Sequence, residues 1–402
     1  MTETEQGFAA DIAVELGTGK SLVQPQAGAV PHNGDMIPLE RRLAESLYRR
    51  EDGAAIIVAT PTLAQGINLP AQVAILAGDK RSGADGERAR LEQHELLNAA
   101  GRAGRAGFLA NGMVLLVPEP VIGFTPEQPA LAAYPKLLSI LPTDDRCVLV
   151  EDPIEHMLDQ IQLGQVSARI DYFVNRMRSG EPDEAGAAAV LLTRRSFGAF
   201  LARKRGETID AAVAALEQAL AATPSEDDET GSLVAALTGL PRDAVAVLAA
   251  RLGTDPAGFP VTIPAWVTWI VEFFRREPEA AGHLVGGLDT IKAVTRGRKT
   301  GGPITDAEFD RLNLALQAWI SGRPFSEIEQ ALGVAANAVK TCKRSRDLVL
   351  KVVGRNLYMV ATAVSELAKR RLAPTAEGVV QIPAVIDILA YALRAGFDSA
   401  AK

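Results

Sequence analysis

The sequence predicts an α/β domain with a parallel sheet, followed by an all-α region. Over residues 1–120, short apolar runs rich in β-branched residues alternate with helical segments. A group of prolines then indicates a connector at residues 121–143. Beyond it, strand patterns nearly vanish, and alanine-rich helical periodicity predicts two helical regions, residues 144–260 and 261–402.

Three continuous apolar runs predict the strands of the sheet: Ala54–Ala59, Val73–Ala77 and Met113–Val117. Such runs are typical of parallel strands that are buried on both faces. Helices are predicted at Pro38–Arg50, before the first strand, and at Glu87–Ala99, between the second and the third. Strands and helices that alternate at this spacing favour right-handed crossover connections.

The helical region predicts three further features. Phe309–Leu332 has the pattern of two helices that meet at Ser321–Pro324, and Asn337–Leu372 that of one long helix, with Gly354 as the place of an interruption. The polar stretch Ala222–Gly231 predicts a loop. Aromatic residues such as Trp266 recur at helical spacing, which favours core packing over base stacking.

The composition describes an ordinary globular protein. Its 402 residues are 48% hydrophobic and 23% charged, and the net charge of −7 restricts any nucleic-acid site to a local basic patch. The two cysteines are far apart and the four histidines are scattered, so we expect neither disulfides nor a metal site. We expect a cytoplasmic protein without a secretory signal or a membrane span.

The most informative feature is a pair of sequence blocks, Ala59–Ala71 and Glu95–Gly107. The second block holds Arg102 and Arg105 between glycines. Glycine allows the backbone to approach a ligand closely, and the arginine fork binds phosphate oxygens in pairs. The residue types therefore predict contact with a cluster of phosphates.

In this order and spacing, the two blocks resemble motifs V and VI of the superfamily 2 DEAD/DEAH-type nucleic-acid helicases. More narrowly, they resemble the branch of the antiviral-type RNA helicases and archaeal repair helicases. The resemblance implies that residues 1–120 are a truncated second RecA-like domain, the helicase C-terminal domain. It also implies that the first RecA-like domain is missing and that the chain is a fragment of a complete enzyme.

The resemblance implies a role for each matching residue. Arg102 and Arg105 would act catalytically, reaching a γ-phosphate that is held by the first domain. Five residues would lie near the nucleotide: Gly66, Asn68, Asn98, Gly101 and Gly104. Thr60 and Thr62 would contact the nucleic-acid backbone. Asn98 departs from the family pattern, because it stands where the family usually has a longer Gln.

Two further segments are candidate nucleic-acid contacts. His32 lies in a stretch that resembles the region ahead of motif V, and it is interpreted either as a nucleic-acid contact or as a packed loop residue. Lys340, Arg344, Lys351 and Arg355 fall on one stripe at helical spacing. For this stripe, a strand-contacting basic helix and a solvated charged face both remain open, with Lys351 and Arg355 as the chosen contacts.

The segment Gly17–Ser21 resembles a phosphate-binding loop only in part. The full pattern needs a glycine or alanine where Val14 stands, and the strand expected before such a loop is weak. We therefore interpret the segment as an ordinary turn, and we expect the missing first domain to provide most of the binding of ATP and Mg²⁺.

These observations predict the C-terminal half of an ATP-dependent DNA or RNA helicase. Its expected partners are a single strand of DNA or RNA and a polypeptide that carries the first RecA-like domain, with no membrane partner. Whether the chain is an enzyme depends on that completion, and alone it is predicted to be inactive as an ATP hydrolase. The alternative is a non-catalytic nucleic-acid-binding or interaction module.

Overall fold

The computed structural model divides the chain into two compact units. One comprises residues 1–13 and 21–150, and the other residues 14–20 and 151–402. The structure describes residues 1–60, 71–77, 80–82, 88–90, 103, 112–117, 174, 187, 190–221, 229–254, 259–297, 301–371 and 384–399.

The first unit contains short parallel sheets. Strand β1 (Ala29–His32) pairs in parallel with β2 (Ile56–Ala59), and β3 (Val73–Ala77) pairs in parallel with β6 (Met113–Val117). Strand formation at the three apolar runs and the parallel pairing of the sheet are therefore confirmed. The two pairs are separate two-stranded sheets in the part of the chain that the structure describes.

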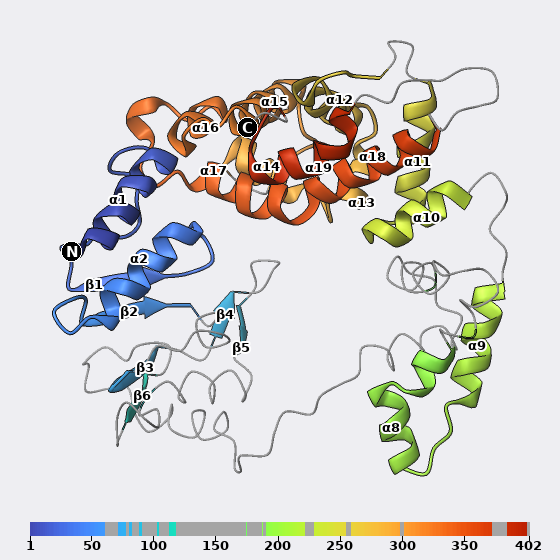
Figure 1. Cartoon of the computed structure of the whole chain (residues 1–402), viewed down its shortest axis with the longest axis horizontal. Helices are drawn as coiled ribbons and strands as arrows, with labels where there is room; N and C mark the ends of the chain where they lie inside the picture. Colours follow the sequence, from blue (N-terminus) through green and yellow to red (C-terminus); the bar gives the residue numbers. More distant parts are fainter. Residues whose placement is uncertain are drawn as a thin grey trace. The chain divides into compact units, whose positions relative to one another are not determined.

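Helix α2 (Pro38–Arg49) packs against β1 and β2, as Figure 1 shows, and it confirms the helix predicted here. Leu43 and Leu47 lie on its buried face. Its first turn is fixed by the buried carboxylate of Glu40, which accepts a hydrogen bond from the backbone N–H of Ile37 at 3.1 Å. Pro38 at the first helical position suits this start, because its missing N–H would have no partner there.

The burial predicted for these strands is wrong. Val58 of β2 is 64% exposed and Ile75 of β3 is 63% exposed, and Met113 of β6 is also exposed. A continuous apolar run is buried only where both faces of a sheet are covered. Of the described helices, α2 packs on β1 and β2, and this cover does not bury all of their apolar side chains.

The helix predicted at Glu87–Ala99 is also wrong at its start. Arg88–Arg90 forms strand β5, which pairs in antiparallel register with β4 (Lys80–Ser82). The sequence between the two strands contains Gly83 and Gly86, and glycines at this spacing favour a hairpin over the first turn of a helix. Residues 91–99 lie outside the described residues.

Residues before β1 form helix α1 (Glu3–Leu16). Glu5 joins the first turns of this helix to α2, because its Oε1 accepts a hydrogen bond from the Ser46 hydroxyl at 3.0 Å. Burial raises the pKa of Glu5, but the hydrogen bonds from the Thr2 backbone N–H and from Ser46, with the nearby Arg50 charge, outweigh it and lower the pKa overall. Glu5 is therefore a buried carboxylate that stays charged.

The secondary-structure elements described in the second unit are helices (Figure 1). Its helices are α8 (Phe197–Lys204), α9 (Asp210–Ala221), α10 (Glu229–Thr238), α11 (Arg242–Thr254), α12 (Ile263–Arg276), α13 (Pro278–Leu284), α14 (Asp289–Arg296), α15 (Asp306–Ile320), α16 (Phe325–Ala331), α17 (Lys343–Asp347), α18 (Tyr358–Arg371) and α19 (Val385–Ala395). The loop predicted at Ala222–Gly231 ends too late, because α10 already begins at Glu229. Residues 222–228 lie outside the described residues.

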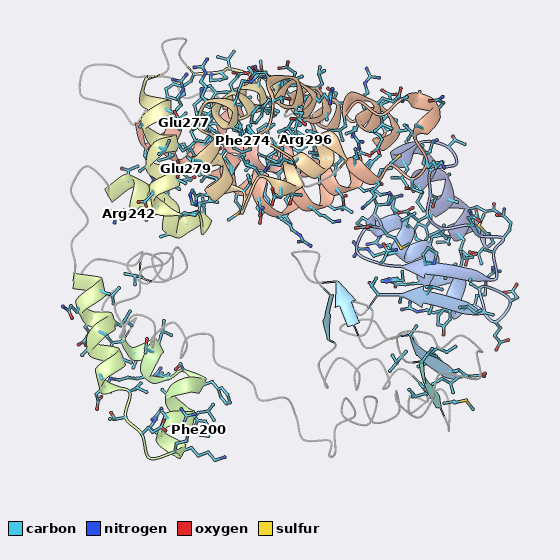
Figure 2. All side chains as sticks on the ribbon, turned by 180° about the vertical axis from the view of Figure 1, so that it is seen from behind. Phe200, Arg242, Phe274, Glu277, Glu279 and Arg296 are labelled. Atoms are coloured by element: carbon cyan, nitrogen blue, oxygen red, sulfur yellow. The ribbon has the colours of Figure 1, made fainter. Side chains whose placement is uncertain are left out.

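Helix α12 provides much of the core of this unit, and its buried Phe274 is labelled in Figure 2. Trp266 and Phe273 are also buried, while Trp269 is half-buried and stacks on Phe273 with ring centroids 6.1 Å apart. The helix packs against α13, α15 and α19. The core-packing interpretation of these aromatic residues is confirmed.

Helices α15 and α16 confirm the prediction of two helices that meet at Ser321–Pro324. The single helix predicted at Asn337–Leu372 is wrong at its start, because it begins only at Lys343. From there it continues through a π-helix, Leu348–Leu357, into α18. Gly354 lies within the π-helix, so the irregularity expected there takes the form of a wider helical turn.

The stretch Lys343–Arg370 is long and apolar enough to pass for a membrane span, but 56% of its most apolar window is buried inside the protein. Val360, Val364 and Leu367 are fully buried against neighbouring helices such as α10 and α19. This stretch is therefore the central core helix of the second unit.

Candidate functional site

Two of the predicted site residues meet at one edge of the first unit. His32 ends β1, and Thr60 follows the last residue of β2. The Thr60 backbone N–H donates to the His32 carbonyl oxygen at 3.2 Å, which continues the parallel ladder by one bond. The block that begins at Ala59 leaves the β1–β2 pair at the carboxyl ends of its strands, which is the edge where parallel α/β sheets commonly bind ligands.

The two residues differ in accessibility. Thr60 is exposed, whereas His32 is only 4% exposed. The His32 Nε2 lies 3.0 Å from Oε1 of Glu45 on α2, and Glu45 in turn lies 3.9 Å from Arg49. Of the two interpretations of His32, the structure supports the packed residue, because its ring ties the end of β1 to α2.

A backbone bridge brings the two sequence blocks together. Ala71, the last residue of the first block, pairs in parallel with Ala103. In the sequence, Ala103 stands between Arg102 and Gly104. The remaining predicted residues lie outside the described part of the chain: Thr62, Gly66, Asn68, Asn98, Gly101, Arg102, Gly104 and Arg105.

The β4–β5 hairpin was not predicted from the sequence. Four of its six strand residues are basic, and the pairing sets Lys80 opposite Arg90 and places Arg81 and Arg88 on adjacent positions of the ladder. Two basic strand segments around a Ser-Gly-Ala-Asp-Gly turn are the signal that could have revealed it. The hairpin lies between the two blocks in the sequence and adds positive charge to an acidic chain.

The Gly17–Ser21 segment has the geometry of a structural turn. The Lys20 ammonium donates to the Val339 carbonyl oxygen, and Gly17 and Gly19 both have positive φ, at 94° and 73°. A phosphate loop requires a helix directly after it, whereas here α1 precedes the segment and β1 follows it. The lysine that would bind phosphate is already engaged with the protein itself.

The described residues do not form a site for Mg²⁺. Nowhere among them do three or more His, Cys, Asp or Glu side chains come together as metal ligands. Nor does the Gly17–Ser21 turn offer a free lysine for a β-phosphate. Among the residues that the structure describes, the donor set therefore does not fit a complete ATP–Mg²⁺ site.

The basic stripe predicted on the long helix is partly wrong. Lys340 precedes the helix, and the Arg344 guanidinium turns toward α14, where it donates to the carbonyl oxygens of Thr295 at 3.5 Å and Arg296 at 3.4 Å. The observed stripe, at intervals of four residues, is Lys343, Asp347, Lys351 and Arg355.

Along this stripe, Asp347 forms ion pairs with both Lys343 and Lys351. Arg355 is exposed on the π-helix. The stripe contains three cations and one carboxylate, so it keeps a net positive charge. Lys351 and Arg355 remain candidate nucleic-acid contacts.

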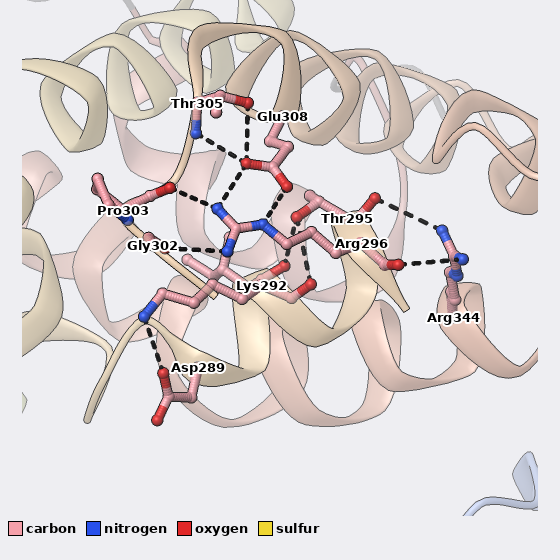
Figure 3. Close-up of polar contacts among 10 residues, drawn as sticks. Asp289, Lys292, Thr295, Arg296, Gly302, Pro303, Thr305, Glu308 and Arg344 are labelled. Atoms are coloured by element: carbon pink, nitrogen blue, oxygen red, sulfur yellow. Dashed lines mark hydrogen bonds and ion pairs between the residues drawn. The ribbon is translucent and has the colours of Figure 1, made fainter. Parts of the chain in front are cut away.

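Arg296, at the end of α14, has a structural role (Figure 3). The Arg296 guanidinium pairs with the buried carboxylate of Glu308 and donates to the Gly302 carbonyl oxygen at 2.9 Å. Glu308 also accepts from the backbone N–H and hydroxyl of Thr305, which caps α15. The Arg296 hydrogen bonds lower the pKa of Glu308 to about 2 against the effect of burial.

Comparison with known proteins identifies helicases as relatives of part of the chain. The chain is 38% identical over 106 residues to the chloroplastic DExH-box ATP-dependent RNA helicase DExH15 of Arabidopsis thaliana, which is 26% of this chain and 8% of that protein. It is 32% identical over 92 residues to the antiviral helicase SKI2 of Saccharomyces cerevisiae, covering 23% of the chain and 7% of SKI2.

A third relative is the ATP-dependent DNA helicase Hel308 of Thermoplasma acidophilum, at 37% identity over 89 residues. The match covers 22% of the chain and 13% of Hel308. No family model matches the chain. The matches thus span between 7% and 13% of the length of these helicases. The chain is a partial relative of the superfamily 2 helicases.

Proposed function

We propose that this chain is the C-terminal half of an ATP-dependent DNA or RNA helicase. It supplies motif V and the motif VI arginines, Arg102 and Arg105, to an ATP site that is shared with a first RecA-like domain outside this sequence. The observation that carries the proposal is the backbone bridge between Ala71 and Ala103, which joins the ends of the two helicase-like blocks.

The other half of the site provides most of the binding of ATP and Mg²⁺. The role of this chain is to place guanidinium groups against the charge that develops on the transferred phosphate. Without the first domain there is no phosphate for them to reach, so the chain alone hydrolyses ATP negligibly.

The strand of DNA or RNA contacts two parts of the chain. In the first unit, the nucleic-acid backbone is contacted by Thr60, at the carboxyl edge of the β1–β2 pair, and by Thr62. In the second unit, Lys351 and Arg355 contact phosphates from the exposed face of the long helix. Replacing both with Gln is expected to reduce the slope of log affinity against log salt by about 1.4, since each neutralised phosphate of a single strand contributes about 0.7.

The decisive experiment measures ATP hydrolysis that is stimulated by single-stranded nucleic acid. The chain is assayed alone and mixed with a polypeptide that carries a helicase first domain. Activity is expected only in the mixture, and Arg105→Ala is expected to reduce it by about a thousandfold or more. Arg105→Lys is the matched control for charge, and it should restore little activity because the ammonium lacks the planar fork.

The alternative function, a non-catalytic binding module, predicts a different result. Salt-sensitive binding to a single strand would then depend on Lys351 and Arg355, while the mixture would show no hydrolysis and Arg105→Ala would have no effect. Hydrolysis by the chain alone that is abolished by Lys20→Ala would contradict both functions.

A further inference from the structure

Helix α8 has an exposed aromatic face that the helicase motifs do not explain. Phe197 is 46% exposed and Phe200 is 55% exposed, and Figure 2 shows Phe200 on this helix. Their rings are stacked on each other, with centroids 6.2 Å apart and an angle of 24° between the planes. Lys204 follows Phe200 by four residues, so it lies on the same face of the helix.

The opposite face of the same helix is the one that packs. Gly198, Ala199 and Ala202 are buried, and the Ser196 side chain caps the first turn by accepting a hydrogen bond from the Ala199 backbone N–H at 3.1 Å. Small residues on the buried face and large rings on the exposed face are the reverse of an ordinary amphipathic helix.

The surroundings of the two rings are strongly basic. Residues 190–206 contain five basic residues and no acidic residue: Arg194, Arg195, Arg203, Lys204 and Arg205. Two of them form ion pairs, Arg194 with Asp210 at 3.0 Å and Arg205 with Glu207 at 2.9 Å. The Arg203 guanidinium donates to the carbonyl oxygens of Ala199 and Arg194. In a chain with a net charge of −7, this segment is a local positive patch.

We propose that Phe197, Phe200 and Lys204 form a stacking platform for the bases of single-stranded nucleic acid. The rings offer the faces on which unpaired bases stack, and Lys204 and its basic neighbours neutralise phosphates. The inference rests on the proposed function for its substrate class, and it adds a contact site that is separate from the long helix.

Charge and shape favour a nucleic-acid strand over other anionic surfaces. An interfacial membrane helix needs a wide apolar face, whereas the large apolar side chains exposed on α8 are those of Phe197 and Phe200, and the face with Gly198, Ala199 and Ala202 is buried. An exposed apolar patch with a charged rim marks a binding site. Stacked rings that are bordered by cations match alternating bases and phosphates.

The test uses the full chain without ATP and measures binding of a fluorescein-labelled single-stranded oligothymidylate by anisotropy. The double variant Phe197→Leu/Phe200→Leu keeps apolar side chains but removes the rings, and its affinity is expected to fall by about fivefold to a hundredfold. Phe197→Tyr/Phe200→Tyr keeps the rings and should bind like the parent. Because both rings are exposed, these variants are expected to fold, and circular dichroism checks this.

Charge is tested separately. Lys204→Gln should reduce the salt slope by about 0.7, while the control Arg276→Gln, which removes another exposed charge on α12, should not change it. Unchanged affinity of the Leu double variant would overturn the platform. So would equal losses in the Leu and Tyr variants, or ring-dependent binding to phosphatidylglycerol vesicles in place of the oligonucleotide.

The proposed function and the stacking platform can fail independently of each other. If the first-domain mixture hydrolyses ATP but the Leu double variant binds normally, the platform is wrong and the helicase function stands. If the mixture is inactive and the rings are still required for binding, the platform is correct in a binding module.

Discussion

The core helix of the helical unit and the strands of the α/β unit differ in how far their apolar side chains are buried. In the helical unit, Phe274 and Trp266 are completely buried. In the α/β unit, Val58 and Ile75 are mostly exposed, although their sequences have the apolar pattern of interior strands. Similar hydrophobicity therefore produces a closed core in one unit and open sheet faces in the other.

The difference comes from how each kind of structure is covered. Amphipathic helices bury one another's apolar faces, and α12 packs in this way against α13, α15 and α19. A parallel sheet must be covered on both faces by other elements. Among the described helices, α2 packs on the β1–β2 pair, so we expect the helical unit to be the more stable of the two.

The largest expected effect tests the closed core. Phe274→Ala should lower the free energy of unfolding of the helical unit by about 3–5 kcal/mol, because it leaves a cavity among packed helices. Urea denaturation followed by far-ultraviolet circular dichroism measures this loss. A loss below about 1 kcal/mol would mean that the core is loosely packed and that the contrast between the units is not real.

Glu308→Gln probes the ion pair that fastens α14 to α15. The pKa of Glu308 is about 2 in the folded protein and 4.5 ordinarily, so its contribution is complete above pH 4.5 and is lost as the pH falls toward 2. At pH 7 the variant should be less stable by about 2–3 kcal/mol. The difference from the parent should shrink between pH 4.5 and pH 2, and a constant difference would contradict the assignment.

Lys20→Met tests whether the glycine-rich turn is structural. The variant removes one hydrogen bond to the Val339 carbonyl oxygen, so we expect a loss of about 1 kcal/mol in stability. Binding of a fluorescent ATP analogue, measured with and without the first-domain polypeptide, should not change. A lost nucleotide signal at unchanged stability would show that Lys20 binds phosphate.

The smallest effect is expected on the open sheet. Val58→Thr keeps a β-branched side chain on an exposed position, so it should change stability by less than about 0.5 kcal/mol. The same measurement is then repeated in the mixture with the first domain. A cost that appears only in the mixture would show that the completed protein covers this face of the sheet.

The sequence predicted the elements that depend on local pattern. The strands at β2, β3 and β6 and the helix α2 were found where apolar periodicity placed them. The hairpin of β4 and β5 was missed, since its charged residues carry no apolar alternation and its second strand was interpreted as the start of a helix. The stripe on the long helix was predicted in part, because spacing alone could not show that Arg344 caps α14.

For the site, the two helicase-like blocks and their order could be identified from residue type and spacing alone, because these carry that information without a fold. Tertiary structure decided how several candidates are used. It buried His32 against Glu45, engaged Lys20 with Val339, and paired Ala71 with Ala103. These outcomes depend on contacts between residues far apart in the chain, which local patterns do not encode. Burial and hydrogen-bond partners therefore had to come from the folded molecule.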